Sequence, residues 1–137
     1  MEQNVNKIRR LVTNNIIFNN TGAGIHTIFI VDGFVKIKIY TRCKTSLVGE
    51  SGITLGITGN SIMFIDETLS TDLTSGLIWL DPINNALYSQ FYEGIFDFGL
   101  GNNQDIILTT SDIITSGELE FACEYTPLSN NARIYGG

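Results

Sequence analysis

Apolar and polar residues alternate with a period of two along much of the chain. The segment 34–44, FVKIKIYTRCK, places Val35, Ile37, Ile39 and Cys43 on one face and its cations on the other. This alternation predicts a half-buried β-strand, because successive side chains of a strand point to opposite faces. Further strands are predicted at 25–31, 53–59, 61–69, 76–81, 92–101, 105–110, 112–117 and 118–128. The succession predicts an all-β fold of about eight to ten short strands, as an antiparallel sandwich, a jelly roll or a closed barrel.

Two strands of this set carry opposite charges on their polar faces. The strand 34–44 places Lys36, Lys38, Arg42 and Lys44 on one side, here called the basic ribbon, and the strand 118–128 places Glu118, Glu120 and Glu124 on one side, here called the acidic ribbon. An antiparallel pairing in which partner numbers sum to 162 sets Lys38, Arg42 and Lys44 opposite Glu124, Glu120 and Glu118, and Tyr40 opposite Ala122. A slip of one residue would place cations against apolar groups, so this register is expected.

The ribbons have three interpretations. They are neutralised solvent-facing surfaces, or the acidic ribbon of one subunit meets the basic ribbon of another, or the basic ribbon docks on an external acidic surface. The same register places Cys43 opposite Leu119, four residues along the strand from Cys123. This separation is too large for a disulfide, so two free thiols that face the core are expected.

Asp32-Gly33 lies between two apolar runs and predicts a type I′ hairpin. In that hairpin Ile30 faces Val35 on the inner side, while Phe29, Val31 and Phe34 lie on the outer side. The outward phenylalanines would face solvent in a monomer. The runs 62–65, 77–80 and 95–98 do not alternate and are apolar on both faces, so these side chains must also be covered by other protein atoms. We expect the cover to be a neighbouring copy, which predicts a symmetric homo-oligomer.

Composition and charge narrow the class of protein. The chain has 137 residues and a net charge of −6, which indicates one domain and makes nucleic acid an unlikely partner. Residues 1–44 contain seven Lys or Arg and two acids, whereas residues 45–137 contain one cation and twelve acids. Residues 1–24, with Lys7, Arg9 and Arg10, are expected to form an irregular N-terminal arm, in which 7–12 is one helical turn or extended; residues 25–137 form the β domain. No signal peptide or membrane span is indicated, so two reduced cysteines in a cytosol are expected.

Catalytic signatures are missing from the sequence. It contains one histidine, His26, and no nucleophile-elbow, phosphate-loop or zinc-protease motif. A Cys–His pair with Cys43 or Cys123 is conceivable, but an ordinary buried role is favoured. Asp66, Glu67 and Asp72 are better explained as turn acids than as calcium ligands. No enzyme activity, metal or cofactor is expected, although a hydrolase with an unrecognised carboxylate pair remains a third reading.

A carbohydrate site is the main alternative from another class. Trp79, Tyr88, Phe91 and Tyr92 surround an amide-containing loop and could stack on a sugar. Such a protein would be a carbohydrate-binding β-sandwich of a phage tail or fibre. The competing explanation is that Trp79 belongs to the core.

The run Ile114-Thr115-Ser116-Gly117-x-Leu119-x-Phe121, followed by YTPLSNNARI at 125–134, resembles small β-rich virion structural proteins of tailed bacteriophages. The order HTIFIVDGFVKI, a turn, then ITLGITG adds to the resemblance, which extends over residues 25–135. It implies a non-enzymatic capsid decoration protein, head-fibre base or related exterior component located in the virion and made in the host cytoplasm. Such a protein would bind neighbouring capsid subunits and itself, with a trimer favoured.

The expected interaction residues combine the arm, the outward phenylalanines and the two ribbons. They are Lys7, Arg9, Arg10, Phe29, Phe34, Lys36, Lys38, Arg42, Lys44, Glu118, Glu120 and Glu124.

Overall fold

The computed structural model describes residues 8–79, 98–101 and 103–137, and it consists almost entirely of strands. The elements in chain order are β1 Arg10–Thr21, β2 Gly24–Asp32, β3 Val35–Val48, β4 Gly52–Ile57, β5 Asn60–Leu69, the short 3-10 helix η1 Ser70–Asp72, β6 Phe98–Leu100, β7 Ile106–Thr110, β8 Ile114–Pro127 and β9 Arg133–Gly136.

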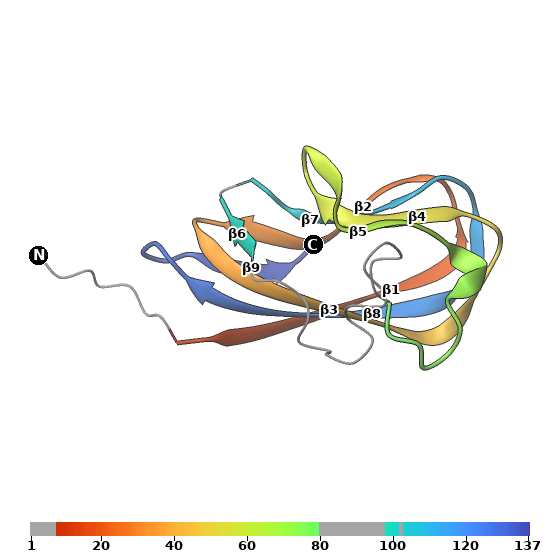
Figure 1. The fold of residues 1–137 in the computed structure, drawn as a ribbon, viewed down its shortest axis with the longest axis horizontal. Helices are drawn as coiled ribbons and strands as arrows, with labels where there is room; N and C mark the ends of the chain where they lie inside the picture. The colour runs from red at the N-terminus through yellow and green to blue at the C-terminus, as the bar shows by residue number, and fades with distance from the viewer. Residues whose placement is uncertain (1–7, 80–97, 102) are drawn as a thin grey trace, which may run out of the picture.

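The strands form two antiparallel sheets packed face to face (Figure 1). The first sheet has the order β1-β8-β3-β6, and the second has the order β5-β4-β7-β2-β9. The pairings are nested: β1 pairs with β8, β2 with β7, β3 with β6 and β4 with β5. The prediction of an all-β antiparallel sandwich is therefore confirmed.

The core lies between the two sheets and is built from the inward face of each. In β8 buried and half-buried residues alternate without interruption from Gly117 to Pro127. Leu119, Phe121 and Cys123 from β8 pack with Ile37 from β3, and all four are at most 1% exposed. Cys43 and Cys123 are both free and buried, as expected. Burial raises the pKa of Cys43, and burial together with the nearby Glu124 carboxylate raises the pKa of Cys123 to about 12.

The predicted register between β3 and β8 is confirmed from Val35 to Cys43. Lys38 lies opposite Glu124, Arg42 opposite Glu120, and Cys43 opposite Leu119. A register shift follows Cys43, so that Thr45 and not Lys44 lies opposite Glu118. The bulge moves the backbone by one position, yet the Lys44 side chain still reaches the Glu118 carboxylate at 3.9 Å.

The expectation of an irregular arm over residues 1–24 is wrong for Arg10–Thr21. These residues form β1, which pairs with β8 along its length, from Arg10 opposite Tyr125 to Thr21 opposite Ile114. The strand is stabilised by burying Phe18 and partly burying Val12 and Ile16 against the core. Residues 1–7, including Lys7, lie outside the described part of the chain.

The predicted hairpin between 25–31 and 34–44 is also wrong, because β2 and β3 belong to different sheets. The chain crosses between the sheets at Gly33, whose φ is 85° and whose backbone packs against Ala132. The backbone groups of Phe34 find partners in the β8–β9 loop: its N–H donates to the Ser129 hydroxyl at 3.0 Å, and its carbonyl accepts from the Leu128 N–H at 2.8 Å. These distant partners replace the hydrogen bonds of a hairpin.

The crossing reverses the expected orientation of β2. Phe29 and Val31, predicted to face outward, are 0% and 2% exposed, and they face the core. A register shift between Thr27 and Phe29 interrupts the alternation, so that Ile28 is buried as well. Phe29 is therefore a core residue and not part of an outer surface.

Several element boundaries differ from prediction. Segments 112–117 and 118–128 form one strand, β8, and β9 was not predicted. Of the predicted strand 76–81, residue Ile78 makes an isolated bridge with Arg42, and of 92–101 the strand β6 is described. Both segments lie along the outer edge of β3, with β6 beside Val35–Ile37 and the 76–79 segment beside Thr41–Cys43.

Candidate interaction surface

The basic and acidic ribbons lie side by side on the outer face of the β1-β8-β3-β6 sheet. The alternation that buries Ile37, Ile39 and Cys43 turns the intervening cations of β3 outward. The same rule turns the glutamates of β8 outward, where they remain half-buried. The Lys36 and Lys38 side chains share this face, and both have partners.

The carboxylates of the acidic ribbon are engaged within the chain. The Arg42 guanidinium binds the Glu120 carboxylate through Nε at 2.9 Å and through a second, shorter contact. The Tyr40 hydroxyl donates to Glu124 Oε2 at 3.0 Å. Glu118 accepts from the Asn15 amide at 2.8 Å as well as lying near Lys44. The interpretation of the ribbons as locally neutralised surfaces therefore fits this geometry.

The energies of these pairs are small. The Arg42 and Glu120 side chains are 56% and 30% exposed, so water screens their attraction. Exposed pairs contribute about 0.2–1 kcal/mol each. The ribbons thus specify which strands meet and in what register, and they leave the bulk of stability to the buried core.

An apolar margin borders the acidic ribbon on the β1 side. Leu11 lies opposite Glu124 and Ile17 opposite Glu118, and these two side chains are 65% and 71% exposed. On the same face, Tyr40 and Arg42 of β3, Glu120 and Ala122 of β8, and Ile78 line a shallow hollow of about 320 Å³. The face therefore combines charged ribbons with exposed apolar side chains, which is a composition typical of protein-binding surfaces.

A second, more polar cleft lies where β1 begins and the β8–β9 loop turns. Its volume is about 760 Å³, and its lining includes Arg10, Asp32, Asn130, Asn131 and Arg133. Arg133 lies 3.6 Å from the Asp32 carboxylate, and its guanidinium also stacks over the Tyr135 ring at 4.9 Å. Arg10 is exposed and has no ion-pair partner among the described residues. The cleft thus offers guanidinium and amide donors to an acidic ligand.

The expected interaction residues are placed as follows. Arg9 and Arg10 are exposed at the start of β1, Phe34 is 60% exposed at the crossing between sheets, and the ribbon residues share one face. Phe29 is buried in the core, so it does not lie on the surface with the other residues.

The described residues give little support to the sugar, Cys–His and calcium sites considered above. Trp79 is 2% exposed and its indole N–H donates to Thr68 at 2.8 Å, so it is a core residue, while the other aromatic residues of the proposed sugar site lie outside the described part of the chain. His26 contacts the Thr110 hydroxyl at 3.3 Å in the sheet opposite to that of the two cysteines. Asp66 and Glu67 lie within β5 and not in a turn, and the Asp66 carboxylate accepts from the Glu67 backbone N–H at 2.7 Å.

Two absences apply to the described residues alone. Within them no three His, Cys, Asp or Glu side chains gather in a way that could hold a metal ion. A helix with the length and apolar character needed to cross a membrane is likewise not found in them.

A cluster of buried hydroxyls at the opposite end of the sandwich was not predicted from the sequence. Ser51 and Ser70, which are 2% and 0% exposed, join the β3–β4, β5–η1 and β7–β8 connections. The Ser70 hydroxyl accepts from the Ser51 N–H at 2.9 Å, and the Ser51 hydroxyl accepts from the N–H groups of Ser111 and Asp112 at 3.2 and 3.1 Å. Serine is common in turns, and its burial depends on loops distant in sequence, so composition alone could not have identified the cluster.

Comparison with known proteins gives a likeness of fold. No protein-family model and no curated protein matches the chain. The chain is similar to one in the acidic stable capsid structure of Helicobacter pylori bacteriophage KHP30, with a TM-score of 0.54 and 12% identity over 93% of this chain and 92% of that chain. A weaker likeness, with a TM-score of 0.40 and 14% identity, is to a chain of the cyanophage Pam1 capsid asymmetric unit, over 87% and 84% of the two chains. The expected resemblance to phage structural proteins is confirmed at the level of fold.

Proposed function

We propose that this protein is a non-enzymatic structural component of a bacteriophage virion, located in the capsid or attached to it. The observation that carries the proposal is the likeness of fold to a chain of the KHP30 capsid, which extends over nearly the full length of both chains. The aligned region covers 93% of this chain and 92% of that chain.

The order of strand pairing supports the same proposal. We interpret the four nested antiparallel pairs, divided between two sheets, as an eight-stranded jelly roll with β9 added at one edge. Jelly rolls occur in viral capsid domains as well as in lectins and cupins. The burial of Trp79 favours the capsid reading over the lectin reading, because a sugar-stacking residue must be accessible.

The surface is suited to contacts with other protein subunits. Leu11, Ile17 and Phe34 are each at least 60% exposed and lie beside charged side chains. We propose that the outer face of the β1-β8-β3-β6 sheet and the N-terminal residues before β1 bind neighbouring capsid subunits. In this proposal the protein decorates the exterior of the capsid as a homo-oligomer, with a trimer favoured, and the interaction residues are those predicted from the sequence other than Phe29.

An add-back experiment tests this function. Purified protein is mixed with particles assembled without it, and the bound fraction is measured after sedimentation through a density gradient. We expect saturable binding of the full chain and weaker binding of a Leu11→Asp/Ile17→Asp variant. Thr27→Asp/Ser61→Asp is the matched control, because it adds the same charge at exposed polar positions of the other sheet. Absence of binding by the full chain, together with its absence from complete virions, would exclude the proposed function.

A further inference from the structure

The two ends of the sandwich expose apolar side chains inside rims of opposite charge. One end, here called the acidic end, exposes Val48, Leu69 and Ile113, which are 53%, 47% and 50% exposed. The connections that form it, residues 48–52, 67–73 and 111–113, contain four carboxylates and no Lys or Arg. Apolar side chains within a polar rim are typical of a protein–protein contact.

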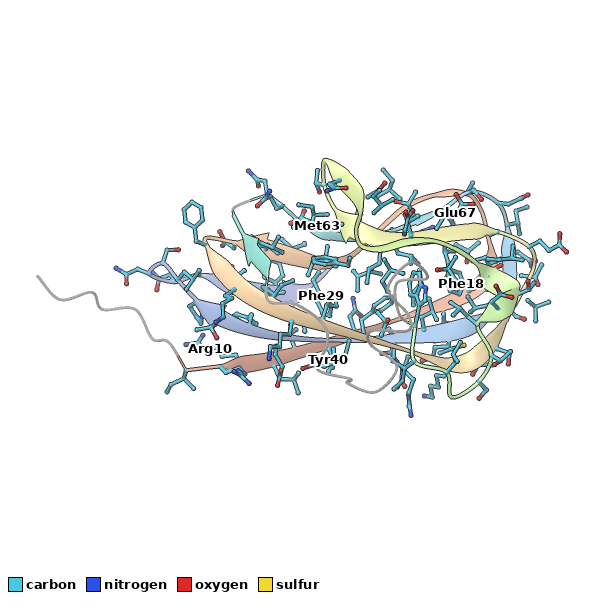
Figure 2. The ribbon with its side chains drawn as sticks, in the orientation of Figure 1. Arg10, Phe18, Phe29, Tyr40, Met63 and Glu67 are labelled. Atoms are coloured by element: carbon cyan, nitrogen blue, oxygen red, sulfur yellow. The ribbon has the colours of Figure 1, made fainter. Side chains whose placement is uncertain are left out.

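The opposite end, here called the basic end, has the complementary composition. It exposes Ile8, Phe34 and Leu128, which are 69%, 60% and 48% exposed. The segments 8–10, 32–36, 103–105 and 127–133 contribute four cations, Arg9, Arg10, Lys36 and Arg133, against two acids, Asp32 and Asp105. Figure 2 places Arg10 and the acidic-end residue Glu67 towards opposite ends of the molecule.

The acidic end is held in a fixed shape. The buried hydroxyls of Ser51 and Ser70 join its three connections, and the Thr115 hydroxyl donates to the Val48 carbonyl at 3.0 Å. Gly49, with a φ of 107°, packs directly against the backbone at Ile113 and Ile114. A surface already ordered in the free chain loses less conformational entropy on binding than a flexible loop.

The basic end has a cavity that could receive carboxylates. The polar cleft of about 760 Å³ opens beside Phe34 and Leu128, which are joined by a backbone hydrogen bond of 2.8 Å. Arg10 lines the cleft without an ion-pair partner among the described residues, and Asn130 and Asn131 add amide donors. Exposed apolar side chains and donors that have no ion-pair partner among the described residues therefore lie side by side at the basic end, whereas carboxylates surround the apolar side chains of the acidic end.

We propose that the occupant of the basic end is the acidic end of a second copy of this chain, so that copies associate end to end. In this contact the carboxylates of the acidic end, Glu50 foremost, enter the arginine-lined cleft while Ile113 and Val48 pack on Phe34 and Leu128. Because the two surfaces differ, the contact is heterologous, and repetition of it closes a ring or extends a chain. This contact leaves Leu11 and Ile17 of the outer sheet face free for capsid binding, and it assigns Arg10 and Phe34 to self-association.

Sedimentation velocity of the purified protein tests the contact by charge reversal. Wild-type chain is expected to associate beyond a dimer at low salt and to dissociate as salt rises, because the rim charges are exposed. Arg10→Glu and Glu50→Lys, each made alone, should weaken association about tenfold or more. The doubly reversed chain Arg10→Glu/Glu50→Lys should recover association to within about threefold of wild type, because the two charges attract again.

The matched control is Thr13→Lys/Thr27→Lys, which changes net charge by the same amount as Glu50→Lys at exposed mid-strand positions. It should associate like wild type, and circular dichroism should confirm that every variant is folded. A wild-type chain that is monomeric at all concentrations, a closed dimer, or a doubly reversed chain that stays as weak as the single variants would each overturn the proposal. Because no particle is used, these outcomes are independent of the add-back test of virion function.

Discussion

Replacing Ser70 by alanine removes the hydroxyl that joins two connections at the acidic end. Ser70 is 0% exposed, and its hydroxyl accepts from the Ser51 N–H at 2.9 Å and donates to the Gly49 carbonyl. Alanine fits the site without strain but leaves a buried donor and an acceptor unpaired. Two lost hydrogen bonds and the uncompensated burial of their partners cost about 2–4 kcal/mol. Against a total stability of about 5–15 kcal/mol for a domain, this is a large fraction.

Urea unfolding monitored by tryptophan fluorescence measures the cost. With a denaturant dependence of about 2 kcal/mol per molar, a loss of about 2–4 kcal/mol lowers the midpoint by about 1–2 M. Ser75→Ala is the control, because the Ser75 hydroxyl also donates to a backbone carbonyl, that of Lys44 at 2.9 Å, but both groups are exposed and water can replace the bond. We expect the control to lose less than about 0.5 kcal/mol. If Ser70→Ala is no less stable than Ser75→Ala, the hydroxyl cluster does not hold the acidic end together.

Three further predictions concern the ribbons, a thiol and a tight turn. A double-mutant cycle on Arg42 and Glu120, measured by urea unfolding, should give a coupling of about 0.2–1 kcal/mol that falls in high salt; a salt-independent value above 2 would contradict the exposed geometry. Cys123, with its pKa raised to about 12, keeps its proton when the protein is folded. Its contribution to the free energy of unfolding is therefore complete below the pKa of the unfolded thiol, near 9, and is lost as the pH rises from there towards 12. The free energy of unfolding of the wild type should therefore fall more steeply with pH over that range than the free energy of unfolding of Cys123→Ala. The same pH dependence in both proteins would contradict this prediction. Gly56→Ala should destabilise by more than about 2 kcal/mol in thermal unfolding, because a Cβ there would lie 2.2 Å from the Asn60 carbonyl oxygen; a neutral effect would show that the β4–β5 turn shifts easily.

The pairing of β3 with β8 was predictable because it depends on a pattern spread over many residues. The register sets Lys38 opposite Glu124 and Arg42 opposite Glu120 on one face, and buried residues opposite each other on the other face. A shifted register would have violated both faces together. A local bulge after Cys43 could not be foreseen, because it depends on the backbone path near Thr45 and on no residue type.

The prediction of a hairpin at Asp32-Gly33 was wrong because the burial of apolar side chains outweighed the local preference for a turn. Pairing β2 with β3 in one sheet would have exposed Phe29 and Val31, whereas crossing to the second sheet buries both. Burying two such side chains contributes about 1.5–3 kcal/mol each. The turn sequence suits the crossing equally well, since Gly33 supplies the positive φ in either case.

Strand β1 was missed because its inward face contains a polar residue and its outward face an apolar one. Asn14 faces the second sheet, where its amide donates to the Ile28 carbonyl at 2.8 Å, while Ile17 is 71% exposed. Both depart from the alternation that identifies a half-buried strand. The exposure of Ile17 is explained if the surface at β1 contacts other subunits. The sequence pattern alone could not distinguish such a strand from an irregular segment.

The most direct test of the proposed virion role is quantitative mass spectrometry of purified particles produced from the genome that encodes this chain, combined with electron cryo-microscopy of the same particles. The account predicts the chain in many symmetry-related copies, with density that fits the two sheets on or within the capsid shell. Particles that contain no copy of the chain, while the infected cell accumulates it free, would contradict the account.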